Sequence, residues 1–185
     1  PDNFHLFAKL VYLCVLLLIE LQATFQIAIC RTEWIFSWLG QFTLDRNDFV
    51  SAEGLRKGAY VLSDATDNKL TLILIASGSE VGLILAAAET LRRDGFAVRC
   101  VSMPSWELFD TQTQAYRDEV LPPDVPARLA VELGVAQGWQ RYVGDRGGVL
   151  GVNRFGASAP AETLLSEYGF TVENVVKRAR ELLSR

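Results

Sequence analysis

The 185-residue sequence has only one histidine, three cysteines and one methionine. The histidine, His5, stands near the start of the chain and far from every motif described below. A Ser-His-Asp triad, a Cys-His pair or a multi-histidine metal site therefore cannot be assembled within residues 6–185. Together with the motifs below, this scarcity leads us to predict no catalytic residue, no cofactor-binding residue and no metal ligand.

The cysteines are too few and too widely spaced for a disulfide framework. Cys14, Cys30 and Cys100 form no CxxC pair, and their number is odd. This usage fits a reducing compartment, so we expect a cytoplasmic protein. Cys100 lies in an apolar, strand-like run and is expected to be buried in the core.

Basic charge is also in short supply. Eighteen Lys and Arg residues stand against 22 Asp and Glu residues, which gives a net charge of -4 and a pI near 5.1. A nucleic-acid partner is not expected, because such proteins need a basic face to neutralise phosphates. There is no GxGxxG motif and no Walker lysine, so nucleotide sites of those kinds are not expected either.

Residues 1–44 form an apolar segment of unclear origin, with only five of the charged residues. Leu10–Ile19 is an unbroken apolar run of ten. It is shorter than the roughly 20 residues that span a bilayer, and no small-x-small cleavage site follows it. A buried helix of a larger domain, a signal peptide and a stretch foreign to the domain all remain open. A membrane anchor over residues 6–39 is disfavoured but stays open too. Because the chain begins at Pro1, we interpret it as a fragment or an incomplete gene product.

Residues 45–185 alternate between strand and helix patterns. Leu70–Ala76 is a continuous apolar run, as in a strand that is covered on both faces. After it, apolar residues recur at helical spacing over 81–91, and Arg92–Gly95 provides a helix end. Further strands are predicted at 57–63, 98–103, 128–133 and 148–153, and further helices from about Pro160 and Thr171. This order predicts one α/β domain with three layers.

Ser77–Glu80 follows the strand predicted at Leu70–Ala76 and opens the next helix, and it allows two interpretations. Backbone N–H groups at a helix start can hold an anion. The same residues also match a capping box, in which the Ser77 hydroxyl accepts the Glu80 N–H and the Glu80 carboxylate returns to Ser77. The capping box needs no ligand and is favoured.

Two further segments combine charged and aromatic residues. Pro104–Asp110 contains Trp106 and Phe109, which we interpret as packing anchors or as part of a subunit contact. Glu107 and Asp110 are three residues apart, but without a base, a metal ligand or a pocket they are not assigned as a catalytic pair. Arg154, at a strand end, can bind a carboxylate or a phosphate, although pairing with a neighbouring acid is the favoured role.

Several runs over residues 42–185 resemble the C-terminal domain of transketolase. These runs are SAEGLRKGAYVLSDA (51–65), ILIASGSEV (73–81), VRCVSMPSWELFD (98–110), YRDEVLPP (116–123), GWQRYVGD (138–145) and GVNRFGASAPAETLLSEYGFTVENVVKRARELL (151–183). The combination of SMPSWELFD and RFGASAP is the most specific part of this resemblance.

The resemblance implies a fold and an activity. The fold is a five-stranded mixed sheet in a three-layer α/β/α arrangement, with the first strand antiparallel and the order 1-3-2-4-5. The family activity is transfer of two-carbon ketol units between sugar phosphates, with thiamine diphosphate and magnesium. Family members are dimers, so the implied partners are the remainder of a transketolase and its dimer mate. In the family, a pyrophosphate-binding and a pyrimidine-binding domain hold the cofactor, the metal and the catalytic histidines and glutamate.

The sequence departs from the family pattern upstream of the domain. Neither cofactor-binding domain is present, so the chain alone is expected to bind no cofactor and to be inactive. The family has an Arg-Gln-Asn-like segment, whose arginine binds substrate phosphate, just before Leu44–Arg46. Here the preceding residues are Ser37–Phe42, and the match ends at about residue 42.

We therefore weigh three functions. The first is a structural, non-catalytic C-terminal domain of a transketolase, with Trp106, Phe109, Trp139 and Tyr142 as a possible interface. The second is a stand-alone module for a small molecule or an anion. Its crevice follows from the implied strand order and has Ser77, Gly78 and Ser79 on one side and Gly134–Gln137 on the other. The third is a membrane-tethered interaction domain.

The domain boundary gives a first testable prediction. Deleting residues 1–44 should leave cooperative thermal unfolding intact and raise solubility, because residues 45–185 contain apolar strands and amphipathic helices that can form their own core. Differential scanning calorimetry and sedimentation of the two chains compare them directly. A truncated chain that unfolds without a cooperative transition would show that the apolar segment supplies part of the core.

Overall fold

The computed structural model describes residues 51–65, 69–155, 157 and 159–184. The apolar segment 1–44, its run Leu10–Ile19 and the proposed boundary at residue 45 lie outside the described residues. Within the described ranges, no helix is both long and apolar enough to cross a membrane.

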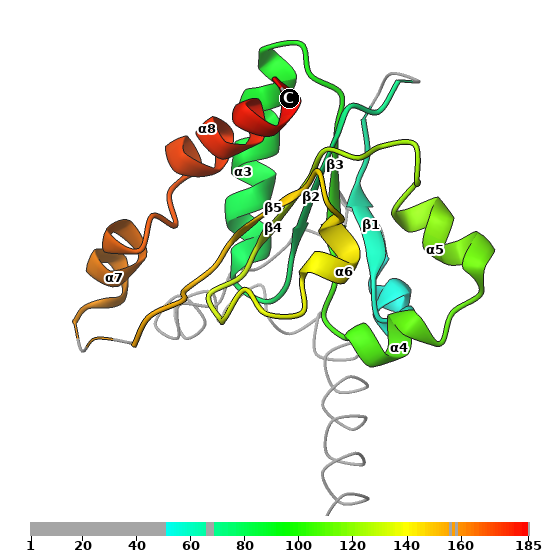
Figure 1. Ribbon diagram of the computed structural model, residues 1–185, viewed down its shortest axis with the longest axis horizontal. Helices are drawn as coiled ribbons and strands as arrows, with labels where there is room; N and C mark the ends of the chain where they lie inside the picture. Colours follow the sequence, from blue (N-terminus) through cyan, green and yellow to red (C-terminus); the bar gives the residue numbers. More distant parts are fainter. Residues whose placement is uncertain (1–50, 66–68, 156, 158, 185) are drawn as a thin grey trace, which may run out of the picture. The chain divides into compact units, whose positions relative to one another are not determined.

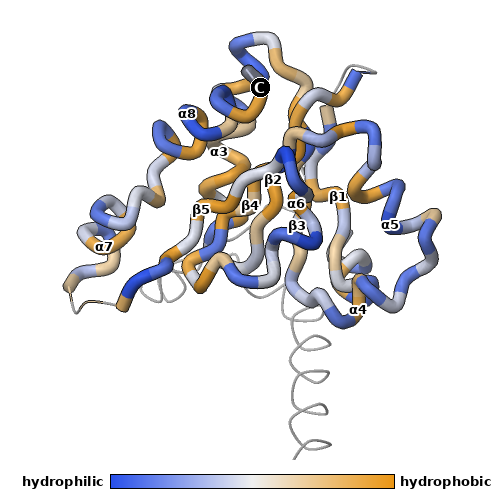
Figure 2. The backbone as a smooth tube through the Cα atoms, in the orientation of Figure 1, coloured by the Kyte–Doolittle hydropathy of each residue, from blue (hydrophilic) through white to orange (hydrophobic). Residues whose placement is uncertain are grey.

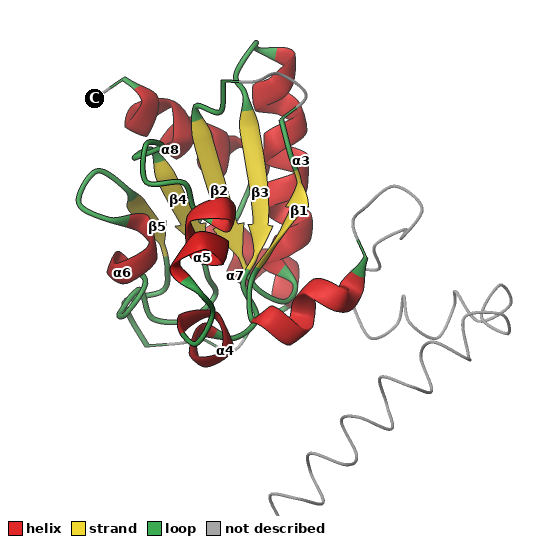
Figure 3. Ribbon diagram, turned by 90° about the vertical axis from the view of Figure 1, so that its right-hand side faces the viewer, coloured by secondary structure: helices red, strands yellow, loops and turns green. Residues whose placement is uncertain are grey.

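A five-stranded sheet forms the centre of the domain (Figures 1 and 3). Its strands are β1 (Tyr60–Ser63), β2 (Leu72–Ala76), β3 (Val98–Ser102), β4 (Arg128–Val131) and β5 (Gly148–Leu150). The order is β1-β3-β2-β4-β5; β1 pairs antiparallel with β3, and all other pairs are parallel. The mixed sheet and its order are thus confirmed. The first predicted strand is shorter than expected, because a 3-10 helix, η2 (Ala52–Lys57), occupies its beginning.

The middle strand, β2, is buried along its whole length. Leu72 and Leu74 belong to one apolar cluster and Ile73 and Ile75 to the other, because alternate side chains of a strand point to opposite faces. Both faces of β2 are therefore covered, which explains why its sequence is continuously apolar rather than alternating.

Two long helices cover one face of the sheet. They are α3 (Glu80–Arg93) and α8 (Val172–Leu183), and a shorter helix, α7 (Ala161–Glu167), precedes α8. The helix predicted from about Thr171 is confirmed, and Val175, Val176, Ala179 and Leu182 on one side of α8 are all buried. Cys100 is fully buried beneath this layer, and burial raises the pKa of its thiol to about 12.

Three short helices cover the other face: α4 (Trp106–Asp110), α5 (Gln114–Val120) and α6 (Gln140–Val143). Figure 2 shows hydrophobic stretches along the strands, whereas the helices alternate between hydrophobic and hydrophilic residues. The side chains of Phe109, Trp139 and Tyr142 join Ile73 and Ile75 in the cluster on this face. The prediction of three layers is therefore confirmed.

Arg128 holds the layer of short helices to the sheet. Its guanidinium donates hydrogen bonds to four backbone carbonyls: Val125 (3.0 Å), Tyr142 (2.8 Å), Leu121 (3.2 Å) and Pro122 (2.8 Å). Burial lowers the pKa of Arg128, while Asp118 and Asp124 act in the opposite direction. An arginine supplies five donors in a fixed planar fork, which suits this set of carbonyls.

Replacing Arg128 should therefore destabilise the domain. We expect Arg128→Met to lower the free energy of unfolding by about 2–4 kcal/mol, because buried carbonyls lose their charged donor. Urea unfolding followed by tryptophan fluorescence measures this difference. Arg146→Met, at an exposed position, is the control and should change stability by less than about 0.5 kcal/mol. Equal midpoints for the two variants would contradict the role given to Arg128.

Candidate functional site

A pocket of about 340 Å³ opens where β2, β3 and β4 end. Its lining residues come from the segments that follow these strands: Ser77, Met103, Pro104, Ser105, Trp106, Glu107, Glu132, Gly134, Val135 and Trp139. The carboxyl ends of parallel strands are the usual ligand site of open α/β sheets. This pocket is therefore the candidate site that the fold itself provides.

The pocket contains part of the crevice predicted from the sequence. Ser77 and Gly134 line it from opposite sides, after β2 and β4 respectively. Gly78, Ser79 and Gln137 are exposed and do not line the pocket. Gly78 has a φ of 53°, a left-handed conformation that suits glycine in the turn between β2 and α3.

The predicted capping box is wrong. The Ser77 hydroxyl donates to Glu132 Oε2 at 3.0 Å instead of accepting the Glu80 N–H. The Glu80 N–H donates to the backbone carbonyl of Ser77 at 3.2 Å. The residue preceding α3 is Ser79, whose backbone is already helical and whose side chain makes no capping hydrogen bond. Ser77 therefore serves the contact between β2 and β4 rather than the helix end.

The Glu80 carboxylate lies at the same helix start and is buried, with 8% of the residue exposed. Its Oε1 accepts the Leu133 N–H at 3.1 Å, and its Oε2 accepts the Ser79 hydroxyl at 3.2 Å. A negative charge is favourable in the first turn of a helix because of the helix dipole. Glu80 thereby ties α3 to the segment after β4.

The pocket is acidic. Glu107 accepts the Ser105 hydroxyl at 3.0 Å and Glu132 accepts the Ser77 hydroxyl at 3.0 Å. Among the residues that the structure describes, no Lys, Arg or His lines the pocket. This acidic lining does not fit a diphosphate or another anion, because both carboxylates would repel its negative charge. Across the described ranges, no group of three or more His, Cys, Asp or Glu residues is placed to hold a metal ion.

The predicted aromatic interface lies mostly inside the domain. Phe109, Trp139 and Tyr142 are 2%, 1% and 4% exposed. Trp106 is half-buried, and its ring meets that of Trp139 edge-on with 5.1 Å between the centroids. The interpretation of Phe109 as a packing anchor is confirmed, whereas Trp139 and Tyr142, which were predicted as part of an interface, are buried inside the domain. Only Trp106 has appreciable surface to offer a partner.

Asp110 and Arg154 make contacts within the domain. Asp110 accepts hydrogen bonds from Arg141 and, at 3.2 Å, from the Tyr142 hydroxyl. Burial and the Asp110 carboxylate raise the pKa of Tyr142 to about 12. The Arg154 guanidinium lies 4.3 Å from the centre of the Tyr168 ring and donates to the Glu167 carbonyl at 3.3 Å. Its contacts are thus a ring and a backbone carbonyl, not the carboxylate that was favoured.

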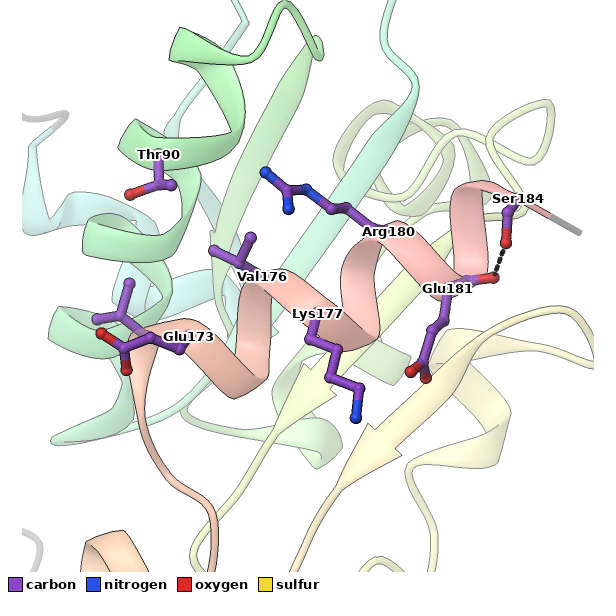
Figure 4. Close-up of a pocket in the computed structure, with 8 residues that line it drawn as sticks. Thr90, Glu173, Val176, Lys177, Arg180, Glu181 and Ser184 are labelled. Carbon is purple, nitrogen blue, oxygen red and sulfur yellow. Dashed lines mark hydrogen bonds between the residues drawn. The ribbon is translucent and has the colours of Figure 1, made fainter.

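A larger groove of about 660 Å³ runs along α8 beside α3 (Figure 4). Its lining mixes charges of both signs, including Glu173, Lys177, Arg180 and Glu181. Arg180 pairs with Asp94 at 2.6 Å. Nothing in this groove brings groups of one chemical kind together, so we assign no ligand to it.

The buried Glu80 carboxylate generates a stability prediction. Glu80→Ala should lower the free energy of unfolding by about 2 kcal/mol, because the Leu133 N–H loses a charged acceptor. Urea unfolding gives the difference, and amide hydrogen exchange at Leu133 should accelerate. Glu89→Ala, at an exposed position of the same helix, is the control. Unchanged exchange at Leu133 in Glu80→Ala would refute the tie between α3 and the segment after β4.

Comparison with known proteins agrees with this architecture. A family model described as the transketolase-like TK C-terminal domain matches residues 58–171. The transketolase of Geobacillus stearothermophilus is 51% identical over 143 residues, which are 77% of this chain and 21% of that protein. The structure of the Leishmania mexicana transketolase is 47% identical with a TM-score of 0.67, over 73% of this chain and 19% of that one.

One neighbour has a different chain organisation. A split-gene transketolase, solved as an inactive β4 tetramer, is 23% identical with a TM-score of 0.56, over 70% of this chain and 43% of that one. At that identity the likeness shows the fold alone. The present chain spans about one fifth of the length of the curated relatives named above. It belongs to the transketolase family and corresponds to the C-terminal domain of its members.

Proposed function

We propose that this chain is a structural, non-catalytic part of a transketolase. The observation that carries the proposal is the match to the last domain alone, about one fifth of each relative. In the parent enzyme, the reaction is transfer of two-carbon ketol units between sugar phosphates. The partners are then the remainder of a transketolase and its dimer mate, and we place the assembly in the cytoplasm.

The chemistry of the pocket supports a non-catalytic role. Thiamine diphosphate supplies the carbanion chemistry of the family when it is bound, and its diphosphate is held through a divalent metal. The pocket offers the Glu107 and Glu132 carboxylates, each already accepting a hydroxyl hydrogen bond, and the described part of the chain adds no basic side chain to its lining. These residues do not fit the cofactor, so we propose that this chain binds none.

The other two functions have less support. A stand-alone anion-binding module would need donors or positive charge in the pocket, and its lining is acidic instead. A membrane-tethered domain would depend on residues 6–39, which lie outside the described residues.

The proposal predicts that the isolated chain has no transketolase activity. Isothermal titration with thiamine diphosphate and Mg²⁺ should give no heat of binding at micromolar concentrations. A coupled assay with xylulose 5-phosphate and ribose 5-phosphate should show no turnover above the buffer. The Geobacillus stearothermophilus transketolase, assayed in parallel, controls for active reagents. Saturable cofactor binding by this chain, or turnover that persists after removal of host enzyme, would contradict the proposal.

A further inference from the structure

The exposed large apolar side chains of the described residues all belong to segments at one edge of the sheet. They are Leu55, Leu108, Leu133, Val135 and Phe155, which are 40%, 46%, 38%, 60% and 100% exposed. None lies on α3, α5, α7 or α8. Scattered exposed apolar residues need no explanation, but several at one edge indicate an interaction surface.

The topology brings these five residues to the same edge. The strands β2, β3, β4 and β5 are parallel, and Leu108, Leu133, Val135 and Phe155 follow the carboxyl ends of β3, β4 and β5. Leu55 precedes β1, which is antiparallel, so η2 comes to that edge as well. In Figure 1, the elements concerned all lie along the lower side of the sheet. We call the five side chains the carboxyl-edge surface.

Hydrogen bonds hold the central part of this surface in place. The Leu133 N–H donates to Glu80 Oε1 at 3.1 Å, and the Val152 N–H donates to the Gly134 carbonyl at 2.8 Å. The Ala136 N–H donates to Asn153 Oδ1 at 3.2 Å. The segments after β4 and β5 are therefore joined, and the backbone around Leu133 and Val135 is ordered before any partner arrives. A preorganised surface loses less conformational entropy when a partner binds.

The acidic pocket opens on the same edge and indicates the charge of a partner. Val135 lines the pocket together with Trp106, Glu107 and Glu132. A Lys or Arg side chain would meet two carboxylates and the half-buried Trp106 ring, all of which favour a cation. The surface thus combines apolar side chains with a cavity that is suited to one basic side chain.

The end at which the chain enters the domain indicates which partner binds the carboxyl-edge surface. The first described element, η2, lies at the carboxyl edge. In the relatives, the other four fifths of the protein precede this domain and therefore join it at that edge. We propose that the carboxyl-edge surface is the docking face for the upstream domains of a transketolase, which present an apolar segment with a Lys or Arg that enters the pocket. This inference rests on the proposed function.

A chimeric enzyme tests the docking face. The 143 residues of the Geobacillus stearothermophilus transketolase that match this chain are replaced by the matching residues of this chain, and activity is measured. In that enzyme, Val135→Asp with Phe155→Asp should reduce activity at least about tenfold, because two charges would be buried at the contact. Ala86→Asp, at an exposed position of α3, is the matched control and should retain most of the activity.

The pocket is tested by charge reversal in the same enzyme. Glu107→Lys should also reduce activity, because it repels the basic side chain of the partner, whereas Glu89→Lys on α3 should not. Equal effects of these two substitutions would overturn the pocket part of the proposal. All variants are also made in the full chain by itself, where melting temperatures within about 2 °C of the parent would show that the exposed substitutions do not unfold the domain.

The outcomes separate the two proposals. An inactive chimera with the unsubstituted domain would refute the proposed function, and the docking face with it. If the unsubstituted chimera is active, and Val135→Asp with Phe155→Asp reduces its activity no more than Ala86→Asp does, the docking face alone is refuted. Sedimentation of the full chain checks self-association. A dimer that Val135→Asp with Phe155→Asp dissociates would assign the surface to a second copy and overturn the proposal.

Discussion

The hydrogen bond from the Leu133 N–H to the Glu80 carboxylate holds the carboxyl end of the sheet together at the candidate site. It joins the first turn of α3 to the segment after β4, across the point where connections from neighbouring strands diverge. The Ser77 hydroxyl makes a second bond across the same gap, to Glu132. In other open α/β sheets, a ligand commonly occupies this position. Here hydrogen bonds from Ser77 to Glu132 and from Leu133 to Glu80 bridge the ends of β2 and β4, and carboxylates line the pocket beside them.

Some features of the sheet could be predicted from the residues themselves, and others could not. The apolar run Leu70–Ala76 identified β2, because only a strand covered on both faces is continuously apolar over so short a length. The strand order came from the family resemblance, since periodicity carries no information on which strands are neighbours. The end of the fifth strand was overestimated: β5 stops at Leu150, and Val152 donates instead to Gly134 in the neighbouring connection.

The candidate site was harder to predict because its decisive contacts are long-range. Ser77 and Glu80 have the three-residue spacing of a capping box, and local rules assign it without reference to the rest of the chain. Their actual partners, Glu132 and Leu133, lie 55 and 53 residues further along the sequence. A pattern within four residues cannot reveal such a competitor. The acidic character of the pocket was missed for the same reason, because Glu107 and Glu132 come from different connections.

The distribution of apolar side chains links the fold to its role. Helices cover both faces of the sheet. The aromatic residues Phe109, Trp139 and Tyr142 are buried in the core on one of these faces. The exposed apolar side chains that remain, Val135 and Phe155 among them, lie at the carboxyl edge, where the first described element, η2, also lies. Burying apolar surface is the main favourable term in association, so a domain that leaves it exposed at one edge is built to be held there. The acidic pocket in that edge then sets which contact is made, since charge complementarity selects a partner more than it adds affinity.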